Sequence, residues 1–198
     1  FSSLKALSVN GSSPGMGKLT AIDLSNNHKL EELSFLNNRV TNLNISGCKE
    51  LKFIHCWENK LTEIDLSSQT LLEELCCAQN FLKEIDITHC HNILNLAIND
   101  NKIEKVDLSN NRHLINIECG GNALSSLDVS ACINLETLNT SYNGSLATIY
   151  LSEGQEIKNI IKDDHTQIVR RDYIAFEDFE FEKYLIERFD VNADGFMS

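Results

Sequence analysis

The stretch LKFIHCWENK, residues 51–60, brings together side chains that can do chemistry: a histidine, a cysteine, an acid and the chain's single tryptophan. Side chains of these types could form a catalytic pocket or a metal site. They could equally form a surface patch in which Trp57 anchors a ligand. The choice depends on which of them share a face, and therefore on the elements that position them.

A repeat of 21 residues organises the chain: from Leu19 the sequence divides into six consecutive units without insertion. Two columns are always Leu or Ile at the positions of Leu30 and Leu33, and one column is always asparagine: Asn38, Asn59, Asn80, Asn101, Asn122 and Asn143. A buried amide can satisfy backbone groups where stacked coils turn. With irregular repeats at both ends, the pattern predicts about seven to eight coils with two apolar walls.

The residues LEELSFLNNRV, 30–40, follow the pattern L-x-x-L-x-L-x-x-N-x-L. With a cysteine at the third strand position, as in LKFIHCWENK, the unit resembles the cysteine-ladder leucine-rich repeat family, which includes internalin J and many surface proteins of Bacteroidetes. The resemblance spans residues 4–162. It implies an α/β-type repeat, a leucine-rich repeat solenoid of mostly β coils, in an extracellular or surface-attached protein that serves adhesion or protein binding without catalysis.

The composition narrows the class of protein. A hydrophobic content of 42% is enough for a sizeable core, and the net charge of −12, without a long basic run, argues against nucleic acid as a partner. No stretch approaches the roughly 20 apolar residues of a membrane span. The first residues lack the features of a signal peptide, so we interpret the chain as a mature or excised fragment.

The seven cysteines fall mostly into two columns of the repeat. The strand column contains Cys56, Cys77 and Cys119, and the second column contains Cys48, Cys90 and Cys132. Neighbours in the second column are about 9.6 Å apart, which is too far for a disulfide. A stacked file also lacks the tetrahedral geometry of a zinc site. We expect these thiols to fill the core, and Cys76 to face outward as a free thiol.

Alternation of strand side chains assigns the outward residues of the face we expect to be concave. Phe53, His55 and Trp57 should form one outward strand, a surface aromatic patch rather than a pocket. The predicted ligand-binding residues are Leu36, Phe53, His55, Trp57, Glu58, Cys76, Gln79, Asn99, Asp100 and Tyr142. The ligand is a protein or a glycan, and no catalytic residue is predicted. Two alternatives stay open: the patch packs under a neighbouring segment, or the repeats select substrates for a larger enzyme.

A column of acids should lie on the opposite wall: Asp23, Asn44, Asp65, Asp86, Asp107 and Asp128. Carboxylates stacked this closely repel one another unless something screens them. The column could hold calcium ions in a ladder. Hydrogen bonding to the adjacent turn is the favoured interpretation.

The tail differs from the repeats, so we divide the chain into a solenoid, residues 1–167, and a helical appendage, residues 168–198. A helix is predicted from about Asp178 to Phe189. It leads into a partial EF-hand-like loop, with Asp190, Asn192, Asp194 and the Phe196 carbonyl at positions 1, 3, 5 and 7. The glutamate expected at position 12 would lie beyond Ser198. The unit resembles one found beside leucine-rich repeats in Bacteroidetes surface proteins, which implies calcium binding in a longer chain; no other cofactor is predicted.

Overall fold

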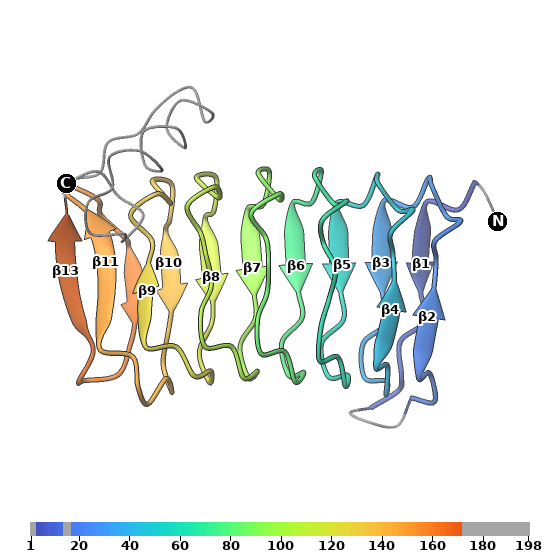
Figure 1. The fold of residues 1–198 in the computed structure, drawn as a ribbon, viewed down its shortest axis with the longest axis horizontal. Coiled ribbons are helices and arrows are strands. Elements are labelled where there is room, and N and C mark those ends of the chain that lie inside the picture. Colours follow the sequence, from blue (N-terminus) through green and yellow to red (C-terminus); the bar gives the residue numbers. More distant parts are fainter. Residues whose placement is uncertain (1–2, 14–16, 172–198) are drawn as a thin grey trace.

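The structure, a computed structural model, describes residues 3–13 and 17–171. This part of the chain winds into a parallel β solenoid whose first and last strands lie at opposite ends (Figure 1). One wall is an eight-stranded sheet in which each coil contributes one short strand. In spatial order the strands are β1 (Ala6–Ser8), β3 (Glu32–Ser34), β5 (Phe53–His55), β6 (Glu74–Cys76), β7 (Asn95–Ala97), β8 (Asn116–Glu118), β10 (Thr137–Asn139) and β12 (Asn159–Ile161).

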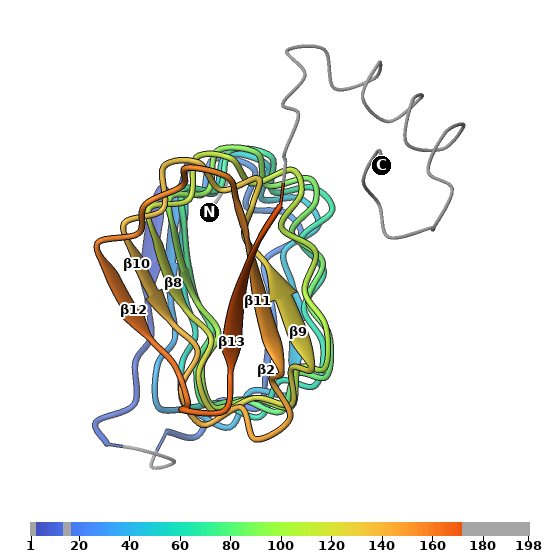
Figure 2. The same cartoon turned by 90° about the vertical axis from the view of Figure 1, so that its left-hand side faces the viewer.

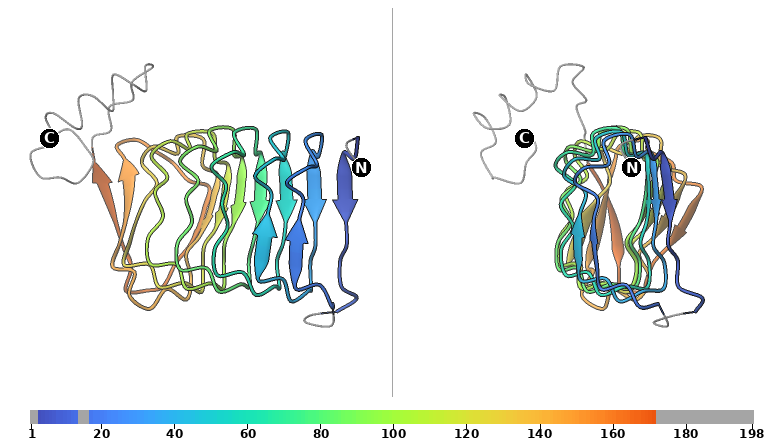
Figure 3. Two further views of the ribbon diagram at one scale, coloured as in Figure 1. Left: turned by 45° about the vertical axis from the view of Figure 1, so that its right-hand side comes forward. Right: turned by 90° about the vertical axis from the view of Figure 1, so that its right-hand side faces the viewer.

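The opposite wall has strands only near the two ends of the solenoid. The first pair is β2 (Ala21–Asp23) with β4 (Asn42–Asn44), and the last group is β9 (Ser126–Asp128), β11 (Thr148–Ser152) and β13 (Gln167–Arg171). Seen along the solenoid axis, the two walls face each other and turns close both edges (Figure 2). An oblique view shows the coils stacked in register (Figure 3). The two predicted apolar walls are confirmed.

Strands make up all the regular structure in residues 3–13 and 17–171, so the fold here is a β solenoid and the α/β part of the predicted class is not seen. Strand β13 continues through Arg171, four residues past the boundary predicted at residue 167. The predicted helix and the loop with Asp190, Asn192, Asp194 and Phe196 lie outside the described residues.

Leucine and isoleucine columns from both walls fill the core. Leu30 and Leu33 are buried on the side of the eight-stranded sheet, and Ile45 and Leu66 face them from the other side. Burial alternates along each short strand, as in β5, where only Ile54 is fully buried. Each coil alone has too little apolar surface to fold, so the stack as a whole provides the core.

The asparagine column closes one edge of the six regular coils, as the sequence predicts. The Oδ1 atom of Asn80 accepts a hydrogen bond from the Leu61 amide at 3.0 Å. Its Nδ2 group donates to the carbonyl oxygens of Cys56, Cys77 and Ala78 at 3.0 to 3.1 Å. One side chain therefore joins backbone groups of its own coil and of the preceding coil in a dry environment, where unsatisfied groups would be costly.

A second buried polar column, which the sequence reasoning did not identify, alternates with cysteine at the other edge. Gln69, Asn111 and Gln155 take turns with Cys48, Cys90 and Cys132. Gln155, for example, donates through Nε2 to the carbonyl oxygens of Val129 and Cys132 at 3.1 and 2.9 Å. The predicted burial of this cysteine column is confirmed, and its neighbours are amides because carbonyl groups of the preceding coil need donors.

The acidic column of the opposite wall is structural. The Oδ1 atom of Asp65 accepts a hydrogen bond from the Ser67 amide at 3.0 Å, and the same bond recurs in most coils. Asp86 also accepts from the Thr88 hydroxyl at 2.6 Å. These local hydrogen bonds lower the pKa of both Asp65 and Asp86, and the bond from the Ser or Thr side chain contributes more than the bond from its backbone amide. The favoured interpretation, hydrogen bonding to the adjacent turn, is confirmed.

Replacing Asp86 tests this role. We expect Asp86→Ala to lower the free energy of unfolding by about 1 kcal/mol at neutral pH, because the Thr88 amide and hydroxyl lose their acceptor. Asp86→Asn should retain most of this stability, because an asparagine oxygen can accept the same two hydrogen bonds. Asn44 already accepts one from the Ser46 amide and one from the Ser46 hydroxyl. Urea unfolding of the three proteins measures both differences.

The pH dependence of the same series has a defined sign. The pKa of Asp86 in the folded protein is lowered from an unfolded value of about 3.9. Its carboxylate therefore stabilises the fold above that value, and this contribution is lost as the pH falls through the lowered pKa. The stability gap between the wild type and Asp86→Ala should narrow on acidification, while the gap between Asp86→Asn and Asp86→Ala stays constant. A difference in the free energy of unfolding between the wild type and Asp86→Ala that does not change with pH would contradict a stabilising role of the ionised Asp86 carboxylate.

Candidate functional site

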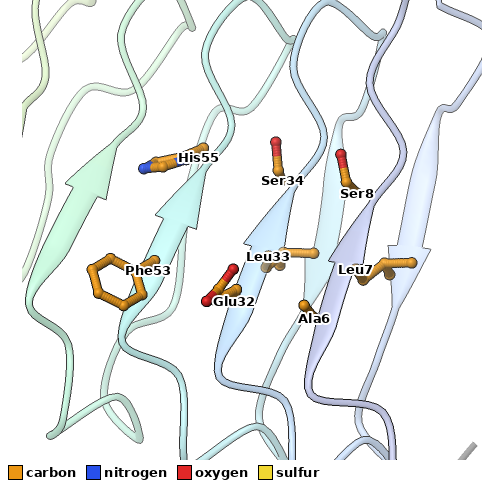
Figure 4. A pocket seen from close by; sticks show the side chains of 8 residues that line it. All are labelled: Ala6, Leu7, Ser8, Glu32, Leu33, Ser34, Phe53 and His55. Atoms are coloured by element: carbon orange, nitrogen blue, oxygen red, sulfur yellow. The ribbon is translucent and has the colours of Figure 1, made fainter.

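The outward side chains of the eight-stranded sheet, here called the sheet face, form two straight rows because all its strands pair in parallel register. At the N-terminal end one row contains Ala6, Glu32, Phe53 and Glu74, and the next contains Ser8, Ser34, His55 and Cys76. Figure 4 shows the first three members of each row, with Leu7 and Leu33 between them on β1 and β3. Residues of neighbouring coils, which are distant in the sequence, therefore lie one strand spacing, about 4.8 Å, apart.

Of the three residues predicted to form one outward strand, Phe53 and His55 lie in β5, and Trp57 lies two residues beyond its end. Phe53 and His55 point outward from β5 and are half-buried, while Trp57, two residues further along, is 43% exposed. His55 Nε2 lies 2.8 Å from Glu74 Oε1 on β6. The aromatic part of the sheet face is therefore partly exposed, and a side-chain hydrogen bond orients His55 within it.

Next to this patch the sheet face is hollowed. The hollow has a volume of about 430 Å³ and is lined by Ala6, Ser8, Glu32, Ser34, Phe53 and His55, over Leu7 and Leu33. It exists because the small side chains of Ala6, Ser8 and Ser34 stand beside the larger side chains of Phe53 and His55 on the same face (Figure 4). The sequence analysis counted the N-terminal residues only as an irregular repeat and assigned no outward side chains to them, so it did not identify β1 as one side of this hollow.

The sheet face is acidic. Its outward carboxylates include Glu32, Glu74 and Glu118, and the outward side chains of the eight strands include no Lys or Arg. Lysines occur at the rim just before the strands, where they pair with acids: Lys5 Nζ lies 2.6 Å from Glu31 Oε1, and Lys52 Nζ lies 3.7 Å from Glu31 Oε2. The rim is therefore close to neutral, and the face beside it carries the negative charge.

The C-terminal half of the sheet face satisfies its own polar groups. Asn116 donates to Asn95 at 2.7 Å and accepts from the Thr137 hydroxyl. Asn139 donates to Glu118 at 2.9 Å. Because these groups already have partners, a ligand would have to break hydrogen bonds to use them. The N-terminal half, as the sequence reasoning favoured, has more to offer a partner.

Four predicted rim residues share a backbone conformation that the sequence did not reveal. Glu58, Gln79, Asp100 and Tyr142 all have φ between 52° and 60°, in the left-handed region. Each directly precedes an asparagine of the buried column, so this turn is a feature of the coil and not of one coil's function. Tyr142 is 82% exposed but lies four strands from Trp57, roughly 19 Å away, and cannot share a small contact with it.

The remaining predicted residues separate into two groups. Leu36 and Cys76 are half-buried on the coils next to Trp57, so they belong with the aromatic patch. Burial raises the pKa of the Cys76 thiol to about 11, which makes it a poor nucleophile at neutral pH. Asn99 and Asp100 hydrogen bond to each other at 3.2 Å, two strands away from Trp57. The structure therefore does not unite the ten predicted residues in one site.

Neither a metal site nor a membrane span is found among the residues that the structure describes. Residues 3–13 and 17–171 contain no cluster of three or more His, Cys, Asp or Glu side chains placed to hold a metal ion. In the same part of the chain, no helix has the length and apolar character that crossing a membrane requires.

Comparison with solved structures identifies the fold. The functional domain of InlJ from Listeria monocytogenes, described as including a cysteine ladder, matches with a TM-score of 0.63 and 25% identity over 78% of this chain and 44% of that one. A leucine-rich repeat protein of Leptospira interrogans matches with a TM-score of 0.65 and 20% identity, over 78% and 43% of the two chains. YopM, a leucine-rich effector protein of Yersinia pestis, matches at 0.61 and 20%, over 84% and 48%.

No protein-family model matches the sequence, and no curated protein matches it either. The chain spans less than half the length of the three solved structures above. Its stacked coils, its asparagine column and these likenesses together give it the fold of a leucine-rich repeat solenoid, consistent with the cysteine-ladder repeats that the sequence resembles.

Proposed function

We propose that this leucine-rich repeat solenoid is a non-catalytic binding module of a bacterial cell-surface or secreted protein, and that it engages a protein ligand through the N-terminal half of the sheet face. The observation that carries the proposal is the exposure of Trp57 on the same coil that contributes Phe53 and His55 to the hollow. Tryptophan concentrates binding energy at protein interfaces, and an exposed apolar patch next to a concave surface is typical of an interaction site.

The surroundings of Trp57 support this use. Each coil is tied to its neighbours by strand pairing and by the asparagine column, so we expect an interface built on this sheet to need little ordering when it binds. The three solved structures of similar fold described above come from the bacteria Listeria, Leptospira and Yersinia, which supports a bacterial source. The same face would serve if the repeats select the substrate of an enzyme located elsewhere in a longer chain.

The test uses peptides selected on the wild-type protein from a random display library. We expect a variant carrying both Phe53→Ala and Trp57→Ala to bind the selected peptides about thirtyfold more weakly, the loss that follows from removing about 2 kcal/mol of interface energy. Peptide titration measured by fluorescence anisotropy gives the affinities.

The matched control is Leu71→Ala, which removes an apolar side chain of similar exposure, 44%, from a turn outside the sheet face. This variant should bind as the wild type does, and urea unfolding should show that the double variant remains folded. Peptides that bind the double variant with unchanged affinity would show that the ligand surface lies elsewhere.

A further inference from the structure

The hollow on the sheet face holds a carboxylate that the fold does not use. Glu32 projects outward from β3 between Ala6 and Phe53, and its side chain is exposed. Within residues 3–13 and 17–171, no hydrogen bond or ion pair engages its carboxylate. The acids next to it differ, because Glu31 pairs with Lys5 and Glu74 bonds to His55.

An aromatic ring stands directly beside this carboxylate. Phe53 pairs with Glu32 in the register of β3 and β5, and Glu74 flanks the ring from the other side. A cation placed over the ring would meet the negative face of its π system and one or two carboxylates at once. Small side chains at Ala6 and Ser8 leave room for such a group on the open side.

The hollow is better matched to arginine than to other ligand groups. A planar guanidinium can stack on Phe53 and still direct its N–H groups to the Glu32 carboxylate, whereas a lysine ammonium is a point charge without a flat face. A neutral sugar would use the rings but would leave Glu32 without an opposite charge. The outward side chains of the eight strands include no Lys or Arg, and the rim lysines Lys5 and Lys52 are paired with Glu31, so the face favours an incoming cation.

We propose that the hollow beside Phe53 and Glu32 receives an arginine side chain of the protein ligand, which makes a basic segment the partner that this surface fits. The inference rests on the proposed function, because it specifies the chemistry of the ligand at the same surface. It assigns roles: Phe53 stacks, Glu32 supplies the opposite charge, and Trp57 contributes apolar contact outside the hollow.

A double-mutant cycle on the selected peptides tests the pairing. One change is Glu32→Gln in the protein, and the other replaces an arginine of the peptide by citrulline, which has a similar shape without charge. We expect the selected peptides to be enriched in arginine. Each single change should weaken binding roughly tenfold, and the two together should weaken it little more than either alone.

Glu118→Gln is the matched control, since it neutralises another glutamate of the same sheet face three strands from Phe53. It should change the affinity less than twofold, and rising salt should weaken the wild type more than the Glu32→Gln protein.

Two results would overturn the inference in different ways. Peptides that need Phe53 and Trp57, but carry no excess of arginine and bind Glu32→Gln normally, would refute the arginine site and leave the proposed function standing. Peptides that bind the Phe53→Ala and Trp57→Ala double variant normally would refute both.

Discussion

Asn80→Ala should lower the free energy of unfolding by about 3–4 kcal/mol, because four hydrogen bonds worth about 1 kcal/mol each disappear from a dry environment. The substitution leaves the Leu61 amide without its acceptor. It also removes the donor that serves the carbonyl oxygens of Cys56, Cys77 and Ala78. Circular dichroism during urea unfolding measures the loss.

Asn99→Ala is the matched control, since it removes the same side chain from the outer surface one coil away. The Asn99 amide bonds only to the exposed carboxylate of Asp100 among the contacts described, and we expect a change below about 0.5 kcal/mol. If Asn80→Ala were no more costly than Asn99→Ala, the buried asparagine column would not be what closes the coils.

Phe35→Cys should be the second large effect, at about 2–4 kcal/mol, although it would extend the cysteine file by one coil. Phe35 occupies the strand column of Cys56 and Cys77 and is fully buried. A cysteine fills much less volume than a phenyl ring, so the substitution adds a cavity to the loss of apolar burial. Thermal and urea unfolding would show whether the coil tolerates the change.

Ile98→Val provides the comparison within the same column. It deletes one buried methylene-sized group from a fully buried site and should cost about 1 kcal/mol. A Phe35→Cys protein as stable as the Ile98→Val protein would mean that the first coils collapse around smaller side chains, and that the column positions are interchangeable.

Sequence periodicity alone determined the architecture of the repeats. The invariant spacing of Leu30, Leu33 and Asn38 through six units leaves few ways to bury every apolar column other than stacking parallel coils. Alternation along a strand then sent Phe53 and His55 outward and Ile54 inward, as observed. These features depend on local geometry that each repeat shares, so a single sequence was sufficient to predict them.

The candidate site itself was decided by tertiary structure. The hollow requires β1, from an irregular half repeat, to pair in register with β3, and the repeat pattern does not specify that pairing. The structure also shows that Lys5 forms an ion pair with Glu31 and that His55 forms a hydrogen bond with Glu74. Only these contacts reveal that the Glu32 carboxylate has no such partner in the described part of the chain. The periodicity determines which residues each coil must bury. The stacking of neighbouring coils determines which outward side chains meet. The repeat pattern cannot predict those contacts, because they join side chains at the same position of different repeats.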